Sequence, residues 1–162
     1  MPTLLTKQQI QQRITELAAQ VSADFDELLA MTVLMGGIPI SWDLLGQVTI
    51  PADKVEWDSV GIESYDGTKR GDLRLYKLTR LPIVGKKVLI FEDIIDSGET
   101  IKELRDLIWQ YRPLSVSVCS LLVREGTPTP EYYGFILRPE AFVKGFGLDE
   151  DQTGRIAQDI CY

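Results

Sequence analysis

The residues best suited to chemistry lie in one stretch, VLIFEDIIDSGET, which runs from Val88 to Thr100. Four apolar residues lead into an acidic pair, and the pair can accept hydrogen bonds from vicinal sugar hydroxyls or from waters around Mg²⁺. The last five residues are Asp96, Ser97, Gly98, Glu99 and Thr100. They stand where a helix begins, so their backbone N–H groups and hydroxyls suit a phosphate. The stretch therefore predicts a pocket for a phosphorylated ribose.

A simpler interpretation of the same stretch is that Asp96 or Ser97 only caps the helix, which is the usual role of such residues. A cap does not account for the adjoining acids Glu92 and Asp93, so we favour ligand binding. The sequence has neither of two other phosphate-binding patterns, G-x-x-x-x-G-K-[ST] and G-x-G-x-x-G.

The surrounding pattern indicates how the stretch is positioned. Residues 87–91 are continuously apolar, as in a strand buried on both faces, and residues 100–111 carry a helical stripe. The chain alternates strands and helices elsewhere, with helices expected at 6–21 and 39–48 and strands at 31–35, 55–65, 72–78, 115–123 and near 133–137. Thr6 is a candidate N-cap, and short extended pieces are expected near 142–146. This predicts an α/β domain with a mainly parallel sheet, interrupted by a hairpin at 55–78, with ligands beyond the carboxyl ends of its strands.

Length and composition exclude several classes of protein. The 162 residues carry a net charge of −7, which argues against nonspecific nucleic-acid binding, and no apolar run approaches a membrane span. We expect a cytoplasmic protein of one domain, 1–162, that binds neither nucleic acid nor membrane, with Cys119 as a buried reduced thiol. The chain has no histidine, so acid–base chemistry must use other side chains.

The order of residues in 88–100 resembles the phosphoribosyl-diphosphate (PRPP) motif of type I phosphoribosyltransferases. Residues 33–37 resemble the diphosphate loop of that family and residues 63–65 the start of its mobile lid. Residues 142–149, with Arg155, resemble its purine-binding and metal-binding segment. The resemblance is closest to the hypoxanthine-guanine branch. It implies the type I phosphoribosyltransferase fold, with a mainly parallel twisted sheet flanked by helices, a lid at about 64–71 and a small C-terminal hood at about 130–162.

The resemblance also implies an activity: hypoxanthine or guanine replaces the diphosphate of PRPP, giving IMP or GMP, with Mg²⁺ as cofactor. The implied partners are PRPP, 6-oxopurine bases and further copies of the chain in a homodimer or homotetramer. Asp96 is the implied general acid–base residue, and the implied PRPP-binding residues are Glu92, Asp93, Asp96, Ser97, Gly98, Glu99 and Thr100. The implied diphosphate-binding residues are Met35, Gly36, Ser64, Tyr65 and Arg155. Those for the purine are Arg124, Phe142, Val143 and Asp149, and those for the metal are Glu92, Asp93 and Asp149.

Three features depart from the family pattern. Met35 stands where Lys or Arg is usual, Arg124 stands where Lys is usual, and the lid is short, as in the xanthine-guanine branch. Arg124 is expected to face the 6-oxo group, or else to point to solvent and pair with a neighbour such as Glu125. Phe142 is expected to stack on the base, or else to be a core aromatic. Alternative functions are a xanthine-guanine enzyme, a non-catalytic PRPP-sensing regulator and a receiver-type signalling domain.

Overall fold

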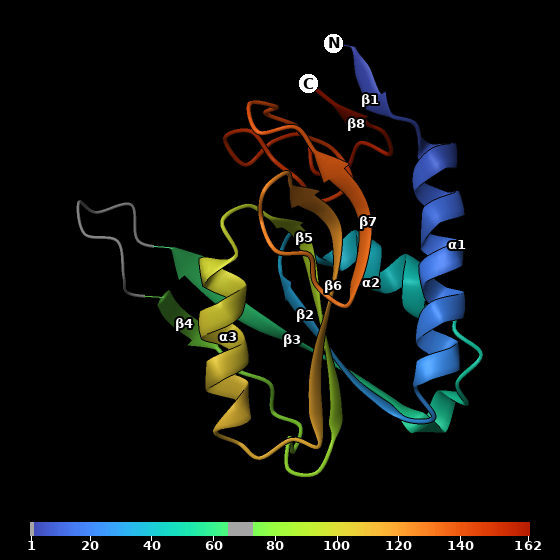
Figure 1. Ribbon diagram of the computed structural model, residues 1–162, viewed down its shortest axis with the longest axis vertical. Helices are drawn as coiled ribbons and strands as arrows, with labels where there is room; N and C mark the ends of the chain where they lie inside the picture. The colour runs from blue at the N-terminus through green and yellow to red at the C-terminus, as the bar shows by residue number, and fades with distance from the viewer. Residues whose placement is uncertain (1, 65–72) are drawn as a thin grey trace.

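A six-stranded sheet forms the centre of the computed structural model, which describes residues 2–64 and 73–162 (Figure 1). Its strand order is β4-β3-β2-β5-β6-β7, and every neighbouring pair is parallel except β3 and β4. The strands are β2 (Leu28–Leu34), β3 (Val55–Ser64), β4 (Leu73–Lys77), β5 (Lys87–Ile95), β6 (Ser115–Arg124) and β7 (Tyr132–Leu137). The predicted α/β fold with a mainly parallel sheet is confirmed.

Helices cover both faces of this sheet. Helices α1 (Lys7–Asp24) and α2 (Ile38–Leu45) lie on one face and α3 (Glu99–Trp109) on the other, and a 3₁₀ turn, η1 (Ala52–Lys54), precedes β3 (Figure 1). Strand β5 serves both faces in alternation. Leu89 and Phe91 join the cluster around α1 and α2, whereas Val88 and Ile90 join the cluster around α3. This alternation explains the continuous apolar run of β5.

Local sequence determines where the first helix begins. Thr6 is its N-cap, as predicted, and forms a reciprocal capping box with Gln9. Ile10, Ile14 and Leu17 are fully buried along one stripe, so the helix is held to the sheet by apolar contacts.

The predicted hairpin is present, and the carboxylate of Asp58 at its base accepts several hydrogen bonds. Asp58 of β3 accepts hydrogen bonds from Lys77 Nζ at 3.0 Å, Thr79 Oγ1 at 2.8 Å and the backbone N–H of Arg80 at 2.9 Å. Partial burial opposes ionisation, but these donors and the N–H of Ser59 together hold the pKa of Asp58 well below its usual range. The carboxylate thus fixes β4 and the segment after it against β3.

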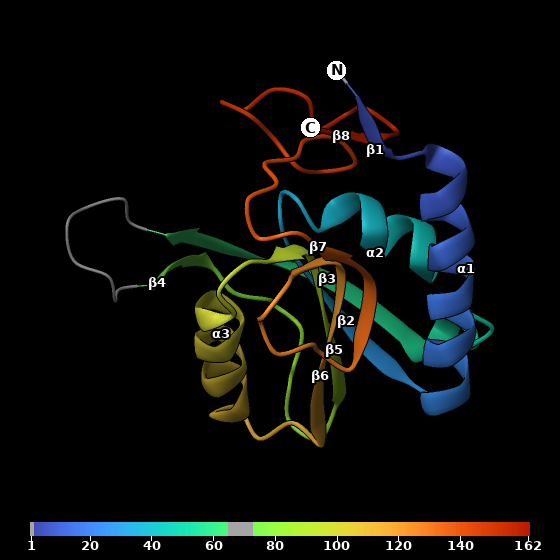
Figure 2. The ribbon, with the colours of Figure 1, turned by 45° about the horizontal axis from the view of Figure 1, so that its top comes forward.

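Residues 138–162 form an irregular layer, which we call the hood, above the carboxyl ends of the strands (Figures 1 and 2). It begins later than the predicted 130, because β7 belongs to the main sheet. The extended pieces predicted near 142–146 form isolated bridges instead, such as Lys144 with Cys161. Strand β8 (Ile160–Cys161) pairs antiparallel with β1 (Thr3–Leu5), so the N-terminal segment secures the end of the hood.

Two further expectations have different outcomes. Cys119 of β6 is fully buried and unpaired, and burial raises the pKa of its thiol to about 12, with Arg13 opposing the rise. The prediction of a buried reduced thiol is confirmed. The predicted lid falls largely on Tyr65 and residues 66–71, which lie outside the described residues. In the described ranges, none of the helices has the length and apolar character needed to cross a membrane.

Candidate active site

The acidic pair lies inside β5, not after it. The strand was predicted to end at Phe91, but it continues to Ile95, with Ile94 and Ile95 paired to β6. Glu92 is 8% exposed, and burial, together with the nearby Asp93 carboxylate, raises its pKa well above the ordinary value. Ionising such a buried carboxyl costs free energy unless a cation or a hydrogen-bond donor lies nearby. Carboxyls with strongly shifted pKa values are common at binding sites.

Asp93 lies against the β2–α2 loop. A Cβ atom at Gly36 would lie 1.8 Å from Oδ2 of Asp93, so only glycine lets the loop approach the carboxylate. The hood approaches the same loop from the other side, because a Cβ at Gly147 would lie 2.2 Å from the carbonyl oxygen of Gly36. Gly147 also has φ +99°, which disfavours other residues. Three separate segments therefore meet at Gly36.

Residues 96–100, which the sequence predicts to bind a phosphate and which we call the phosphate-type loop, follow directly after β5. Gly98, with φ +82°, is the N-cap of α3, and Ser97 Oγ accepts a 3.3 Å hydrogen bond from the N–H of Glu99. The Asp96 carboxylate caps no helix. The capping interpretation is therefore wrong for Asp96, whereas Ser97 does contribute locally. Thr100 and Glu99 are exposed in the first turn, where backbone N–H groups lack partners within the helix.

Arg124, at the end of β6, contacts both the loop and the hood. Its Nε donates to Oδ1 of Asp96 at 2.6 Å, and its Nη1 donates to the carbonyl oxygens of Arg138 at 3.0 Å and Ala141 at 2.7 Å. The arginine side chain is 18% exposed and that of Asp96 71%. The expected alternative, a solvent-facing Arg124 paired with Glu125, is wrong.

The hood residues singled out from the sequence fall into two groups. Phe142 is 64% exposed, so the interpretation of it as a core aromatic is wrong, while Val143 beside it is buried. Asp149 and Arg155 are bound to each other, with Oδ1 2.6 Å from Nη2. Arg155 also donates from Nη1 to the carbonyl oxygen of Gly147 at 2.7 Å. This pair therefore braces the hood turn that touches Gly36.

Two of the residues predicted to bind diphosphate lie at the ends of neighbouring parallel strands. Met35 follows β2, is 59% exposed and is joined to Leu34 by a cis peptide bond. Ser64 is the last residue of β3, the strand next to β2 in the sheet. Tyr65, next in the chain, lies outside the described residues.

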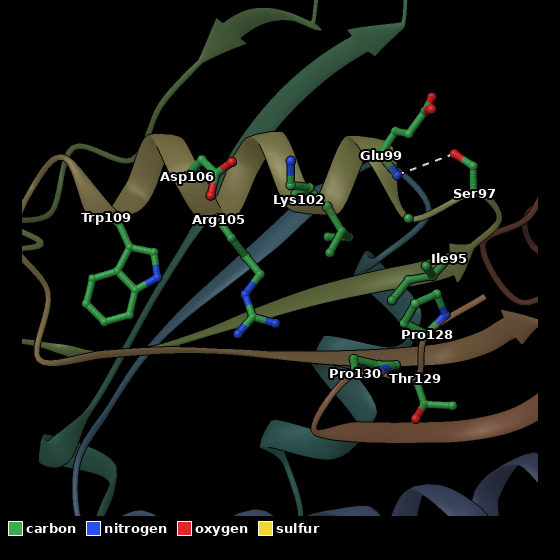
Figure 3. A pocket seen from close by; sticks show the side chains of 12 residues that line it. Ile95, Ser97, Glu99, Lys102, Arg105, Asp106, Trp109, Pro128, Thr129 and Pro130 are labelled. Carbon is green, nitrogen blue, oxygen red and sulfur yellow. Dashed lines mark hydrogen bonds between the residues drawn. The ribbon is translucent and has the colours of Figure 1, made fainter.

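A cavity of about 460 Å³ adjoins the loop, and Ser97, Gly98 and Glu99 of the loop line it (Figure 3). It runs between α3 and the segment of Pro128 to Pro130, with Ser97 at one end and Trp109 at the other. Neither Asp96 nor Arg124 lines it. The cavity therefore shares loop residues with the proposed site but not the Asp96–Arg124 pair.

Among the described residues, no group of three or more acidic, cysteine or histidine side chains could hold a metal ion alone. Asp149 and the acidic pair therefore do not form one protein-only metal site. The oxygen donors still suit Mg²⁺, which usually takes one or two carboxylates and completes its shell with water and substrate phosphates. These residues fit a cation that binds together with a phosphorylated ligand.

Two contacts were not anticipated from the sequence. Thr127 Oγ1 donates to the backbone oxygen of Asp96 at 2.5 Å, and Gly147 makes the close approach to Gly36. A glycine between Phe146 and Leu148 is a weak signal of a tight backbone contact. Nothing local in the sequence indicates the partner of Thr127.

The model of a family described as "Phosphoribosyl transferase domain" matches residues 2–151. The chain belongs to the phosphoribosyltransferase family. Among curated relatives in this family, hypoxanthine phosphoribosyltransferase of Haemophilus influenzae is 32% identical over 161 residues, which cover 94% of this chain and 89% of the relative.

Solved structures agree with this assignment and confirm the type I phosphoribosyltransferase fold. A hypoxanthine-guanine phosphoribosyltransferase from Bacillus anthracis, with a HEPES molecule in its active site, gives a TM-score of 0.90 at 32% identity, covering 99% of this chain and 96% of that one. A variant of the hypoxanthine phosphoribosyltransferase from Trypanosoma cruzi, complexed with the product IMP, gives 0.89 at 31% identity, covering 99% and 89%.

Proposed function

We propose that this phosphoribosyltransferase joins hypoxanthine or guanine to PRPP, releasing diphosphate and forming IMP or GMP for purine salvage. The observation that carries the proposal is the convergence at Gly36, where the acidic pair, the β2–α2 loop and the hood meet. The named relatives and the IMP-bound neighbour support the purine as acceptor.

The reaction replaces one bond at C1 of the ribose with another. The C1–O bond to diphosphate breaks, N9 of the base forms the new bond, and the sugar passes through a state resembling an oxocarbenium ion. The residues around C1 must hold the ribose, accept the negative charge of the leaving group and control one proton on the base.

We assign these tasks by position. The loop 96–100 binds the 5′-phosphate through backbone N–H groups at the start of α3. Glu92 and Asp93 accept hydrogen bonds from the ribose hydroxyls, which gives buried Glu92 the donors that offset its desolvation. The backbone of Met35 and Gly36 binds the diphosphate, together with Ser64, Tyr65 and Arg155.

The base lies between the loop and the hood. Phe142 is exposed and free to stack on the purine, and the backbone of Val143 contacts its edge. Asp96 exchanges the N7 proton through the carboxylate oxygen that Arg124 does not bind. Arg124 Nη2 has no hydrogen-bond partner among residues 2–64 and 73–162, so its two N–H groups can donate to a 6-oxo group but not to the amino group of adenine.

We further propose that one Mg²⁺ enters with PRPP on Glu92 and Asp93, and that Asp149 holds a second Mg²⁺ on the hood side. When bound, the cations neutralise diphosphate charge that would otherwise face an acidic pocket. Excess chelator should abolish turnover, and restored Mg²⁺ should recover it. Full turnover in chelator would contradict this part of the proposal.

The decisive experiment measures nucleotide formation from PRPP and Mg²⁺ with hypoxanthine, guanine, xanthine and adenine. We expect the 6-oxopurines to react and adenine to react poorly. Asp96→Asn should lower kcat by about 10²–10⁴-fold, as for loss of a general acid–base group. The matched control is Asp106→Asn, exposed on α3, which should leave kcat unchanged. No nucleotide from any base would contradict the function, and a normal kcat for Asp96→Asn would remove its role.

The proposed assembly is a homodimer or homotetramer, and the proposed compartment is the cytoplasm. Exposed apolar side chains at Trp42 and Trp57, whose ring centroids lie 5.6 Å apart, support association with another surface. Sedimentation equilibrium of the purified chain tests the assembly, and a monomer at all concentrations would contradict it.

A further inference from the structure

Asp96 is held at two points by the turn that follows β6. Arg124 binds its carboxylate through Nε, and Thr127 binds its backbone oxygen through Oγ1. The turn itself is closed by a 3.0 Å hydrogen bond from Thr127 N–H to the carbonyl oxygen of Arg124. It is also joined to β7, because Glu125 N–H donates to Leu137 at 2.8 Å. One hydrogen-bonded turn therefore contacts both the side chain and the backbone of Asp96.

The same guanidinium also fixes the hood. Nη1 donates to Arg138 and Ala141, the residues that lead into Phe142 and Val143. The arginine is thus bonded on one edge to the carboxylate and on another to the segment that would contact the base. Only a planar group with several fixed donors can serve both at once, and lysine, with one tetrahedral ammonium, cannot reproduce this geometry.

Without such a restraint, the Asp96 side chain has little to hold it. It is 71% exposed and projects from a loop, so its carboxylate would otherwise sample several rotamers. A general acid–base residue must stay within hydrogen-bond reach of its proton, and small displacements of such groups cost much of their rate.

We propose that Arg124 and Thr127 are positioning residues that act through Asp96, setting its free carboxylate oxygen at the distance from the hood that the base requires. The inference rests on the proposed function, because it assumes that Asp96 handles the proton of the base. It adds a task for Arg124 beyond contact with the 6-oxo group, and it brings in Thr127, which has no contact with substrate in the proposed arrangement.

The test is a double-mutant cycle on kcat, with KM for PRPP and for the base measured in parallel. Arg124→Met should lower kcat by about 10–100-fold and leave KM for PRPP within about twofold. Thr127→Val removes the hydroxyl donor with little change in shape, and should lower kcat by about 3–10-fold. Arg124→Lys should fall between wild type and Arg124→Met, and should keep the order of preference among bases.

The cycle is completed in the Asp96→Asn background. If both residues act through Asp96, Thr127→Val should then change kcat by less than about threefold, because effects of residues that act as a unit do not multiply. Arg124→Met should lose less than it does in the wild-type background and keep only the part that comes from its contact with the 6-oxo group. Losses that multiply in full would overturn the positioning role and leave direct contact with the base. If Arg124→Met does not fold, Thr127→Val and Arg124→Lys decide the result alone.

The outcomes separate this inference from the proposed function. A wild-type protein that forms no nucleotide would overturn both. An active wild type with multiplicative losses would overturn only the positioning role. An active wild type in which the Thr127→Val loss vanishes and the Arg124→Met loss shrinks in Asp96→Asn supports both.

Discussion

In the β5–α3 junction, the proposed site residues lie at the end of a buried strand, in the loop after it and in the first turn of an amphipathic helix. In the hood they lie in 25 residues whose only strand is β8, two residues long. Apolar burial positions the first region, since Ile90 and Leu104 are fully buried on the same face of the sheet. Close backbone approaches and side chain–backbone hydrogen bonds position the second, as at Gly147 and Arg155.

The difference has an energetic consequence. Buried apolar area contributes to the stability of the whole domain, whereas a single hydrogen bond or close approach contributes about 0.5–1.5 kcal/mol and acts locally. Substitutions in the junction should therefore change global unfolding, and those in the hood should change activity first. Four predictions test this contrast, from the largest expected effect to the smallest.

The largest effect is expected for Leu104→Ala on α3, where a fully buried side chain is truncated. The free energy of unfolding should fall by about 2–5 kcal/mol, because the lost apolar contacts leave a cavity. Urea unfolding followed by circular dichroism measures it. Glu103→Ala, exposed on the same helix, is the control and should change stability by less than about 0.5 kcal/mol. Equal losses for the two variants would contradict the contrast.

Gly147→Ala should separate activity from stability. The added Cβ would clash with the carbonyl oxygen of Gly36, and φ +99° adds strain, so the hood must move away from the β2–α2 loop. We expect kcat/KM to fall by about 10–100-fold, with a smaller loss of global stability than for Leu104→Ala. Gly85→Ala is the matched control, because Gly85 also has positive φ but no atoms within 4 Å of its Cβ position. Full activity in Gly147→Ala would show that the close approach is dispensable.

Asp58 extends the contrast to the hairpin, where polar contacts stabilise the sheet itself. Its lowered pKa means that its stabilisation is present above the unfolded pKa, about 3.9, and is lost as the pH falls below it. Asp58→Asn should lose about 1–2 kcal/mol at pH 7 and show a weaker loss of stability between about pH 4 and pH 2 than wild type. Unfolding measured across pH tests this, with exposed Asp53→Asn as control. Parallel acid profiles for Asp58→Asn and wild type would refute it.

The smallest effect is expected for Glu150→Gln in the hood. The ion pair of Glu150 with Lys144 has an acid that is 49% exposed, and exposed pairs are worth little. Stability should change by less than about 0.5 kcal/mol and kcat/KM by less than about twofold. A larger loss would mean that surface charge, and not backbone contact, positions the hood. Asp151→Asn, exposed nearby and in no ion pair with another residue of the described ranges, provides the comparison.

The same contrast explains what could be predicted from the sequence. The position of strand β5 and the extent of helix α3 were predicted, because burial and periodicity are local properties of 87–111, although β5 runs to Ile95 and was predicted to end at Phe91. The contact of Arg124 with Asp96 was not, because 28 positions separate the two residues and they become neighbours only through the pairing of β5 with β6, which aligns Ile95 with Val123. The convergence at Gly36 likewise depends on which strands are neighbours, which periodicity does not reveal. The type of site was thus predictable, and its internal contacts were not.

The two cysteines allow the motions of these regions to be timed separately. Cys119 lies in the centre of β6, where burial raises the pKa of its thiol, so a thiol reagent can reach it only after the sheet opens. Cys161 is partly exposed in β8, so a thiol reagent can reach it once this short strand of the hood frays. One labelling reaction therefore gives two rates, a fast one at Cys161 that reports opening of the hood and a slow one at Cys119 that reports opening of the sheet. A substrate that binds against the hood should slow the labelling of Cys161 more than that of Cys119.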